Sequence, residues 1–253
     1  MRVALLITTY NRPSALNSVL QSVVRQSRLP DEVVICDDGS AEDTSALIKS
    51  WSKRLSISHV WTSDRGFRVA LTRNLGILKS KSEILIFVDG DCILPPSFIE
   101  IHGKLTRPGY LTSGGRHLLS PEQTQLALEE DLSVSSIFKH WKFWTCSLGP
   151  LRDLGSTRWE TVRTCNLSAH RENVVRIAGF DESYEGWGRE DSDFVVRLMR
   201  SGVRIRSGRL AVCVAHMHHL ESSREQLSAN DERFQAVLDS SDHIVSYSSI
   251  LKS

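Results

Sequence analysis

Two aspartates one residue apart, Asp89 and Asp91, follow an apolar run over residues 84–88. Such a run predicts a buried strand, which would deliver both side chains to the edge of a sheet. Carboxylate oxygens suit hard divalent cations, and Gly90 between them lets the backbone approach a ligand closely. A simple Asp-Gly turn is the alternative for this pattern taken alone. The metal interpretation therefore depends on chemically related residues elsewhere in the chain.

A second group of acids, which includes Glu190 and Asp191, precedes a helical pattern over residues 194–199. Acids in a first helical turn can merely complement the helix dipole, so this alternative stays open. Trp187, however, stands between two glycines just before the acids. A large flat side chain on a mobile or tightly turned loop offers a surface on which a sugar can stack. The segment therefore predicts a sugar site beside a carboxylate.

Three histidines at positions 216, 218 and 219 follow a short apolar run over residues 210–215. Imidazole is a frequent ligand of first-row metals, although a structural or exposed role is the alternative. His216 is the first choice because it directly follows the expected strand. His218 is the second, since strand alternation would point it the same way. We expect His216 to complete a metal shell begun by Asp91 and Asp89.

Strand and helix patterns alternate through the first hundred residues. Apolar runs that predict strands cover residues 3–8, 33–36, 57–61 and 84–88. Segments with helical spacing lie between them, near residues 16–24, 47–51 and 69–79. This alternation predicts an α/β fold with a mostly parallel central sheet flanked by helices, whose ligands collect at the carboxyl ends of the strands. Thr8, Asp37 and Asp89 lie at those ends.

The composition excludes several classes of protein. With 253 residues and 40% apolar content the chain can bury a full core, and its net charge of +1 does not suggest a nucleic-acid partner. Its five cysteines include no Cys-x-x-Cys pair, which favours a reduced, cytoplasmic protein. No run approaches the roughly 18 apolar residues that a membrane span needs. The start of the chain has too few apolar residues for a signal peptide.

The first turn of the chain lacks both glycine-rich phosphate fingerprints. Residues 9–12 read Thr-Tyr-Asn-Arg, which argues against a dinucleotide fold and a P-loop. A nucleotide would have to be held differently: Asp37 or Asp38 could accept bonds from its base or ribose, and a metal ion at residues 89–91 could take its diphosphate. A turn with a helix cap is the alternative for residues 37–40.

The motifs, taken in order, resemble family 2 glycosyltransferases of the GT-A fold, and the C-terminal part is similar to the galactosyltransferase-type segment of bacterial chondroitin-polymerase-like enzymes. The resemblance spans about residues 3–219. The segments that carry it are residues 8–12, 37–40, 64–68, 73–74, 89–91, 165–168 and 186–191.

The resemblance implies an inverting, metal-dependent transfer of a sugar from a UDP-sugar to an acceptor hydroxyl, in bacterial polysaccharide or lipopolysaccharide synthesis. It implies Mn²⁺ or Mg²⁺ as the cofactor, Asp191 as the general base, and Glu190 as the residue that orients the acceptor or the donor hydroxyls. On the acceptor side it places Trp187 and Arg189, where the family usually has a glycine at position 189. The nucleotide and donor residues that it implies are Thr8, Tyr10, Arg12, Asp38, Arg73, Asp89 and Asn166.

The same resemblance suggests a division of the chain. Residues 1–219 would form the glycosyltransferase domain, with a nucleotide-sugar half (1–115) and an acceptor half (116–219), and residues 220–253 would form a helical extension. Residues 137–144 mix aromatics with cations, which fits an acceptor lid, a membrane-surface contact or core packing. The expected partners are the UDP-sugar and a glycan or glycolipid acceptor. Peripheral contact with the inner membrane surface and self-association are also compatible with the sequence.

Two other functions are weighed against this one. A metal-dependent sugar-phosphate nucleotidyltransferase would use similar acids, but a glycine- and lysine-rich first loop would be expected and is absent. A non-catalytic nucleotide-sugar-binding protein would be expected to have lost an acid. Asp89, Asp91, Glu190 and Asp191 are all present.

Overall fold

The computed structural model describes residues 1–129, 158–209, 211–220, 223–242 and 244–251. The strands are β1 (Val3–Thr9), β2 (Glu32–Asp37), β3 (Ile57–Trp61), β4 (Ile84–Asp89), β5 (Cys92–Ile93), β6 (Tyr110–Ser113), β7 (Gly115–Leu118), β8 (Asn166–His170), β9 (Arg204–Ser207) and β10 (Cys213–His216). The helices are α1 (Pro13–Val24), α2 (Glu42–Trp51), α3 (Val69–Lys79), α4 (Phe98–Leu105), α5 (Pro121–Glu129), α7 (Arg171–Arg176), α8 (Glu190–Arg200) and α9 (Leu227–Asp239), with a short 3-10 helix at Trp159–Thr161.

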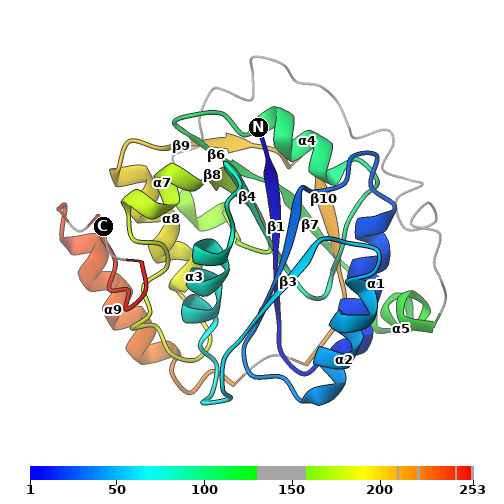
Figure 1. The fold of residues 1–253 in the computed structure, drawn as a ribbon. Coiled ribbons are helices and arrows are strands. Elements are labelled where there is room, and N and C mark those ends of the chain that lie inside the picture. The colour runs from blue at the N-terminus through cyan, green and yellow to red at the C-terminus, as the bar shows by residue number, and fades with distance from the viewer. Residues whose placement is uncertain (130–157, 210, 221–222, 243, 252–253) are drawn as a thin grey trace.

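The described strands form one large sheet and one small sheet (Figure 1). The large sheet has the order β3-β2-β1-β4-β8-β6-β9. Its first four strands run parallel, whereas β8 lies antiparallel to both β4 and β6. This confirms the expected α/β fold with a mostly parallel sheet.

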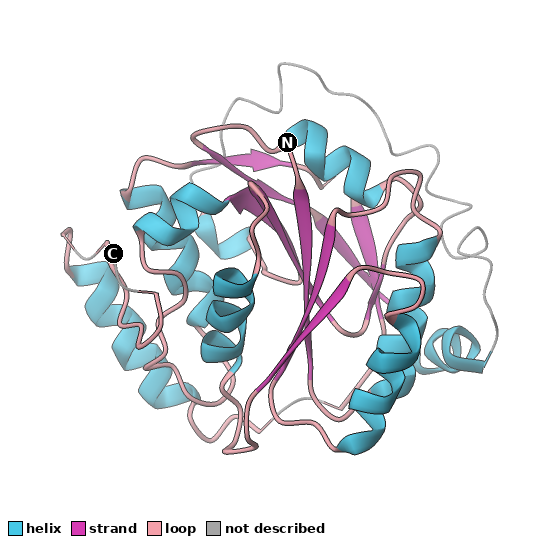
Figure 2. Ribbon diagram, in the orientation of Figure 1, coloured by secondary structure: helices cyan, strands magenta, loops and turns pink. Residues whose placement is uncertain are grey.

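Helices cover both faces of the large sheet, because the inner strands are apolar on both sides (Figure 2). In β1, Leu5 and Ile7 belong to the core cluster that includes residues of α1 and α2. The alternate residue Leu6 belongs to the opposite cluster, with residues of α3 and α8. The sheet is therefore packed between two helical layers, which hold its strand ends in position.

The strand ends converge as the sequence predicts. In the parallel register Thr8 lies opposite Asp89, and Thr9 lies opposite Asp37. Gly90 follows directly, and a Cβ there would lie 2.9 Å from the carbonyl oxygen of Thr8. Only glycine therefore lets the chain leave β4 so close to β1.

The small sheet, of order β5-β10-β7, brings the C-terminal strand β10 close to Asp91, just after the end of β4. Strand β10 lies antiparallel to β5, with His216 opposite Cys92, and the backbone N–H of Met217 donates to the carbonyl oxygen of Asp91 at 2.9 Å. The end of β10 is thus held beside Asp91.

One expected strand has different bounds in the structure, and one expected segment lies outside the described residues. The strand expected over residues 210–215 is described from Cys213 to His216. The aromatic and cationic stretch at 137–144 lies outside the described residues. Within the described part of the chain, no helix is both long enough and apolar enough to cross a membrane.

Candidate active site

Arg73 joins the acids of the two halves of the chain. It lies on α3, is only 4% exposed, and places guanidinium nitrogens 3.3 Å from Asp89, 3.4 Å from Glu190 and 3.0 Å from Asp191. The guanidinium carbon lies 5.2 Å from the centre of the Phe180 ring. Sequence analysis placed Arg73 in the nucleotide site, but its described contacts make it the bridge between two groups of acids.

Arg73 stays protonated, and therefore positively charged, in this site. Burial opposes this charge, but the three carboxylates outweigh this effect and raise the pKa of Arg73 above its ordinary value. A permanent cation therefore lies among three acids at the carboxyl end of β4.

The two adjacent acids at the start of α8 are driven to opposite protonation states. Burial and the neighbouring Asp191 charge raise the pKa of Glu190 to about 8. Burial acts in the same direction on Asp191, but the charge of Arg73 and hydrogen bonds from Thr164 outweigh it and lower its pKa. Thr164 donates from its hydroxyl at 2.5 Å and from its backbone N–H at 3.1 Å. At neutral pH, Asp191 is therefore ionised and Glu190 is mostly protonated, a division typical of acid–base pairs in enzymes.

The raised pKa of Glu190 predicts a pH-dependent stability. The folded protein keeps a proton that the unfolded chain releases above about pH 4.5, so the free energy of unfolding falls as pH rises from there to about 8. Glu190→Gln cannot ionise. We therefore expect its melting temperature to rise relative to the wild type between pH 5 and pH 8.5, as measured by thermal unfolding in a pH series.

A suitable control is Glu185→Gln, which removes a carboxylate from an exposed position of the preceding loop. Its melting temperature should follow the wild type at every pH. A difference between Glu190→Gln and the wild type that does not change with pH would contradict the assignment.

Asp91, His216 and His219 form a cluster whose potential ligand atoms all lie within 4.8 Å of one another. Each imidazole Nε2 is 3.5 Å from an Asp91 oxygen, longer than an ordinary N–H···O bond. Burial and the nearby His219 lower the pKa of His216, although Asp91 acts the other way, so its ring favours the neutral form that binds metals. One carboxylate and two imidazoles suit a first-row divalent ion, and these residues fit the metal that the sequence predicts.

The structure selects different partners for Asp91 than the sequence did. His219 joins His216 in the cluster, whereas His218 lies outside it, and the backbone N–H of His218 donates to the Thr124 hydroxyl. The alternation argument for His218 fails because β10 ends at His216. Asp89 also lies outside this cluster. The run of histidines was a sufficient signal for a candidate metal cluster, but it did not show which of residues 218 and 219 lies beside Asp91.

Arg12 also contacts Asp91, through the same oxygen that lies nearest His219. Its Nη1 donates to Asp91 Oδ2 at 2.6 Å, from the residue that caps the start of α1. Sequence analysis expected Arg12 to bind the donor. Arg12 lies beside the candidate metal cluster. A diphosphate bound to a metal ion there would also lie close to the Arg12 guanidinium.

Two expected nucleotide residues lie at the ends of β1 and β2. Asp38 accepts hydrogen bonds from the Arg68 backbone N–H at 2.7 Å and from the Thr72 hydroxyl at 3.0 Å. Tyr10 donates to Asp64 at 2.8 Å while its side chain stays 45% exposed. The ring of Tyr10 is available for stacking, whereas Asp38 anchors the loop before α3.

Asn166 is committed to contacts within the protein. Its amide nitrogen donates to the Gly115 carbonyl at 2.7 Å, and its amide oxygen lies 2.8 Å from His102 Nε2. Both ends of the amide are therefore used, which favours a role in holding the β6–β7 connection over the expected donor contact.

Trp187 is held between two other parts of the chain. Its side chain is 41% exposed, with the guanidinium carbon of Arg224 5.3 Å from its ring. The backbone N–H of Gly186 donates to the carbonyl of Phe67 at 3.0 Å, and Asn230 on α9 donates to the carbonyl of Glu185 at 2.9 Å. The helical extension therefore supports the loop that carries Trp187.

Arg189 stands where the family usually has a glycine, and its conformation and contacts are relevant to this difference. It has the left-handed φ of 76°, a conformation that favours glycine, and its side chain pairs with Asp231 on α9. Arg189 thus forms an ion pair with the C-terminal helix α9 that a glycine at this position could not form. Its side chain is directed to α9, whereas the sequence interpretation placed it on the acceptor side.

Thr164 was not identified from the sequence. It immediately precedes the family-like segment 165–168, and that neighbourhood was the available signal. Its two hydrogen bonds to Asp191 depend on β8 lying beside β4, which the local pattern did not reveal.

Two known protein families match parts of this chain. Residues 4–116 match the family described as Glycosyl transferase family 2, and residues 155–221 match the N-terminal domain of galactosyltransferase.

Curated relatives carry names of the same kind. The O-antigen chain rhamnosyltransferase RfbN of Salmonella typhimurium is 34% identical over 89% of this chain and 69% of its own length. The validoxylamine A glucosyltransferase of Streptomyces hygroscopicus subsp. limoneus is 28% identical over 92% of this chain, which spans only 56% of that protein. The chondroitin synthase of Escherichia coli is 25% identical over 81% of this chain and 33% of its own length.

Solved structures share the fold at low sequence identity. S. aureus TarS 1-349 in complex with UDP has a TM-score of 0.62 at 14% identity, and the match covers 91% of this chain and 63% of that one. The mannosyltransferase PcManGT from Pyrobaculum calidifontis, in complex with GDP-Man and Mn²⁺, has a TM-score of 0.59 at 19% identity, and the match covers 94% and 62%. The resemblance and the GT-A fold expected from the sequence are confirmed, and the chain belongs to glycosyl transferase family 2.

Proposed function

We propose that this chain transfers a sugar from a UDP-sugar to an acceptor hydroxyl, with inversion at the anomeric carbon and with the help of Mn²⁺ or Mg²⁺. The observation that carries the proposal is the arginine bridge. Arg73 brings the strand-end Asp89 together with Glu190 and the ionised Asp191. A donor held at the strand end would then have its anomeric carbon close to a carboxylate base.

In the proposed reaction, the acceptor oxygen forms a bond to the anomeric carbon as the bond from that carbon to the diphosphate oxygen breaks. Asp191 takes the hydroxyl proton, and Thr164 and Arg73 hold its carboxylate in place. Glu190, which is mostly protonated at neutral pH, can donate a hydrogen bond to a sugar hydroxyl. No covalent intermediate is needed.

A metal ion at this site would be held by Asp91, His216 and His219. When bound, it would supply positive charge that offsets the charge developing on the leaving diphosphate. Arg12, 2.6 Å from Asp91, would add a cation on the same side. Tyr10 would flank the base of the nucleotide with its exposed ring.

The names of similar proteins support the proposed UDP-sugar donor and the proposed role in surface-glycan synthesis. TarS was solved with UDP and PcManGT with Mn²⁺, and RfbN is named for O-antigen synthesis. We therefore place the activity in bacterial surface-glycan synthesis, in the cytoplasm, with a glycan or glycolipid as acceptor. Contact with the inner membrane surface and self-association are part of the same proposal.

The test is a panel of UDP-sugars, with GDP- and dTDP-sugars for comparison, each with and without Mn²⁺. Thermal shift reports donor binding, and release of the nucleotide reports slow donor hydrolysis. One UDP-sugar should stabilise the protein in a metal-dependent manner. Stabilisation by another nucleotide class alone would overturn the UDP assignment, and binding without any turnover would favour a non-catalytic protein.

The metal site predicts a specific loss of affinity. Asp91→Asn keeps the volume but removes the charged ligand, so Mn²⁺-dependent UDP binding should weaken by about 2 kcal/mol, roughly 30-fold. UDP titrations with and without Mn²⁺ measure this. Equal Mn²⁺ dependence in the wild type and the variant would remove the metal assignment.

The histidine cluster supplies its own control. His216→Ala and His219→Ala should each raise the Mn²⁺ concentration needed for half-maximal UDP binding, whereas His218→Ala should leave it unchanged. A requirement altered by His218→Ala alone would contradict the observed cluster.

A further inference from the structure

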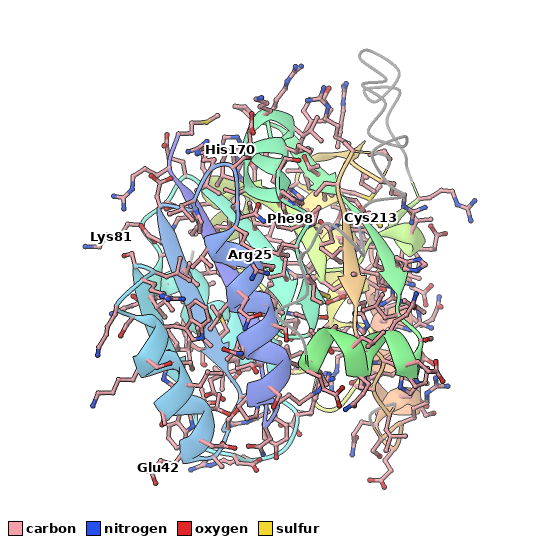
Figure 3. The ribbon with its side chains drawn as sticks, turned by 90° about the vertical axis from the view of Figure 1, so that its right-hand side faces the viewer. Arg25, Glu42, Lys81, Phe98, His170 and Cys213 are labelled. Atoms are coloured by element: carbon pink, nitrogen blue, oxygen red, sulfur yellow. The ribbon has the colours of Figure 1, made fainter. Side chains whose placement is uncertain are left out.

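Three arginines line a cavity that the reaction proposed above does not use. This arginine pocket has a volume of about 500 Å³, and its lining includes Arg116, Arg163 and Arg209 together with Glu160, Cys165 and Asn166. Three cations thus face one carboxylate. Cys213 also lines the pocket, and Figure 3 shows it on the side of the molecule opposite Lys81.

The arginine pocket adjoins the candidate active site. Cys165 on its wall directly follows Thr164, which donates twice to Asp191. Asn166 on the same wall pairs in register with Val88, the residue before Asp89. Arg116 also pairs in register with Val214, two residues before His216 on β10. A molecule with a hydroxyl at Asp191 could therefore extend into the pocket.

The pocket lies on the acceptor side of the sheet. The strands that carry the expected nucleotide residues, β1 and β2, are on one side of β4. The pocket is built from the start of β8 and from the β6–β7 connection, on the other side of β4. A nucleotide on β1 and β2 would not fill it.

Two of the arginine side chains, Arg163 and Arg209, are oriented by backbone carbonyl oxygens, and Glu160 is the one acid among the described residues of the pocket wall. Arg209 donates to the Thr161 carbonyl at 2.5 Å, and Arg163 donates to the Glu160 and Val162 carbonyls at 2.7 Å each. Carbonyl oxygens orient a guanidinium without cancelling its charge. The remaining N–H groups form a planar fork, which matches the paired oxygens of carboxylate and phosphate groups.

We propose that the arginine pocket binds a carboxylate or phosphate group carried by the acceptor glycan, so that the enzyme selects anionic acceptors. This inference rests on the proposed sugar transfer, because only that reaction requires an acceptor. The binding of the anionic group itself can be measured without turnover.

The test uses three probes that differ at one position of the sugar: p-nitrophenyl β-D-glucoside, its 6-phosphate, and p-nitrophenyl β-D-glucuronide. Their dissociation constants are measured by ligand-observed NMR on the whole chain. Charged hydrogen bonds predict that at least one anionic probe binds about 10-fold or more tightly than the neutral one. The better of the two identifies the preferred group, phosphate or carboxylate.

The variant Arg116→Gln/Arg209→Gln should abolish this preference while the affinity for the neutral probe and for UDP stays unchanged. Lys81→Gln, which removes a cation from a cavity on the opposite side, is the matched control and should behave as the wild type. Thermal unfolding verifies that each variant is folded. If the double variant does not fold, the single variant Arg116→Gln, at an exposed position, takes its place and should reduce the preference.

Three outcomes would overturn the proposal. The wild type could bind all three probes equally, or Lys81→Gln could lose the preference to the same extent. In the third, the double variant would lose affinity for UDP-glucuronate but not for UDP-glucose, which would assign the anionic group to the donor. Failure of every nucleotide sugar to bind the wild type would instead count against the proposed function, since the probes are measured without a donor.

Discussion

Asp191→Asn is expected to lower the rate of sugar transfer by about 10²- to 10⁴-fold, with donor affinity kept within about threefold. The asparagine keeps the shape, and its single amide oxygen can still accept one of the two Thr164 bonds, but it cannot take the acceptor proton. Most of the proposed donor contacts lie at the ends of β1, β2 and β4, and Arg73 keeps its contact with Asp89 when Asp191 is changed. Single-turnover transfer, paired with calorimetry of UDP-sugar binding, separates the two effects.

Glu190→Gln is the matched control, because it changes the adjacent acid at the start of the same helix. Glu190 is mostly protonated at neutral pH, so a neutral amide should cost less turnover than Asp191→Asn does. The assignment of the base to Asp191 would be lost if Glu190→Gln had the larger effect on the rate. It would also be lost if weaker donor binding explained the whole defect of Asp191→Asn.

Arg73→Met should produce the largest loss of stability. It would leave Asp89, Glu190 and Asp191 close together without their shared cation, and removing one partner from a buried ion pair typically costs about 3–5 kcal/mol. The loss should shrink as pH falls, because protonation of the acids relieves their repulsion. Urea unfolding at pH 5 and pH 8 measures both effects.

Two further substitutions calibrate this result. Arg73→Lys keeps the charge but loses the fork that reaches three acids, so it should be intermediate. Arg65→Met removes an exposed arginine from the loop before α3 and should change stability by less than about 0.5 kcal/mol. A loss in Arg73→Met that is equal at both pH values would show that packing, and not charge, makes Arg73 important.

The sequence by itself determined the framework of the N-terminal half. The apolar runs that end at Thr8, Asp37 and Asp89 are short and bounded by polar turns, and each became a parallel strand. Periodicity is a local property, so it can be read without knowing the fold. Since parallel strands end at one edge, the meeting of these residues followed from topology alone.

The tertiary structure decided which side chains meet. The pairing of β8 with β4 and β6, which brings Thr164 to Asp191, joins segments far apart in the chain, and no local pattern encodes such a register. The contacts of Arg73 with both groups of acids depend on how α3 and α8 pack against the same face of the sheet.

In the candidate metal cluster, too, the sequence alone did not determine which side chains meet, even between adjacent residues. The sequence placed a histidine beside Asp91, yet the choice of His219 over His218 depends on the point where β10 stops pairing with β5 and β7. Beyond that point strand alternation no longer holds, and the path of the backbone sets the direction of each side chain. The sequence thus determined the chemistry available at the strand ends, and only the packing of distant segments determined which groups act on one another.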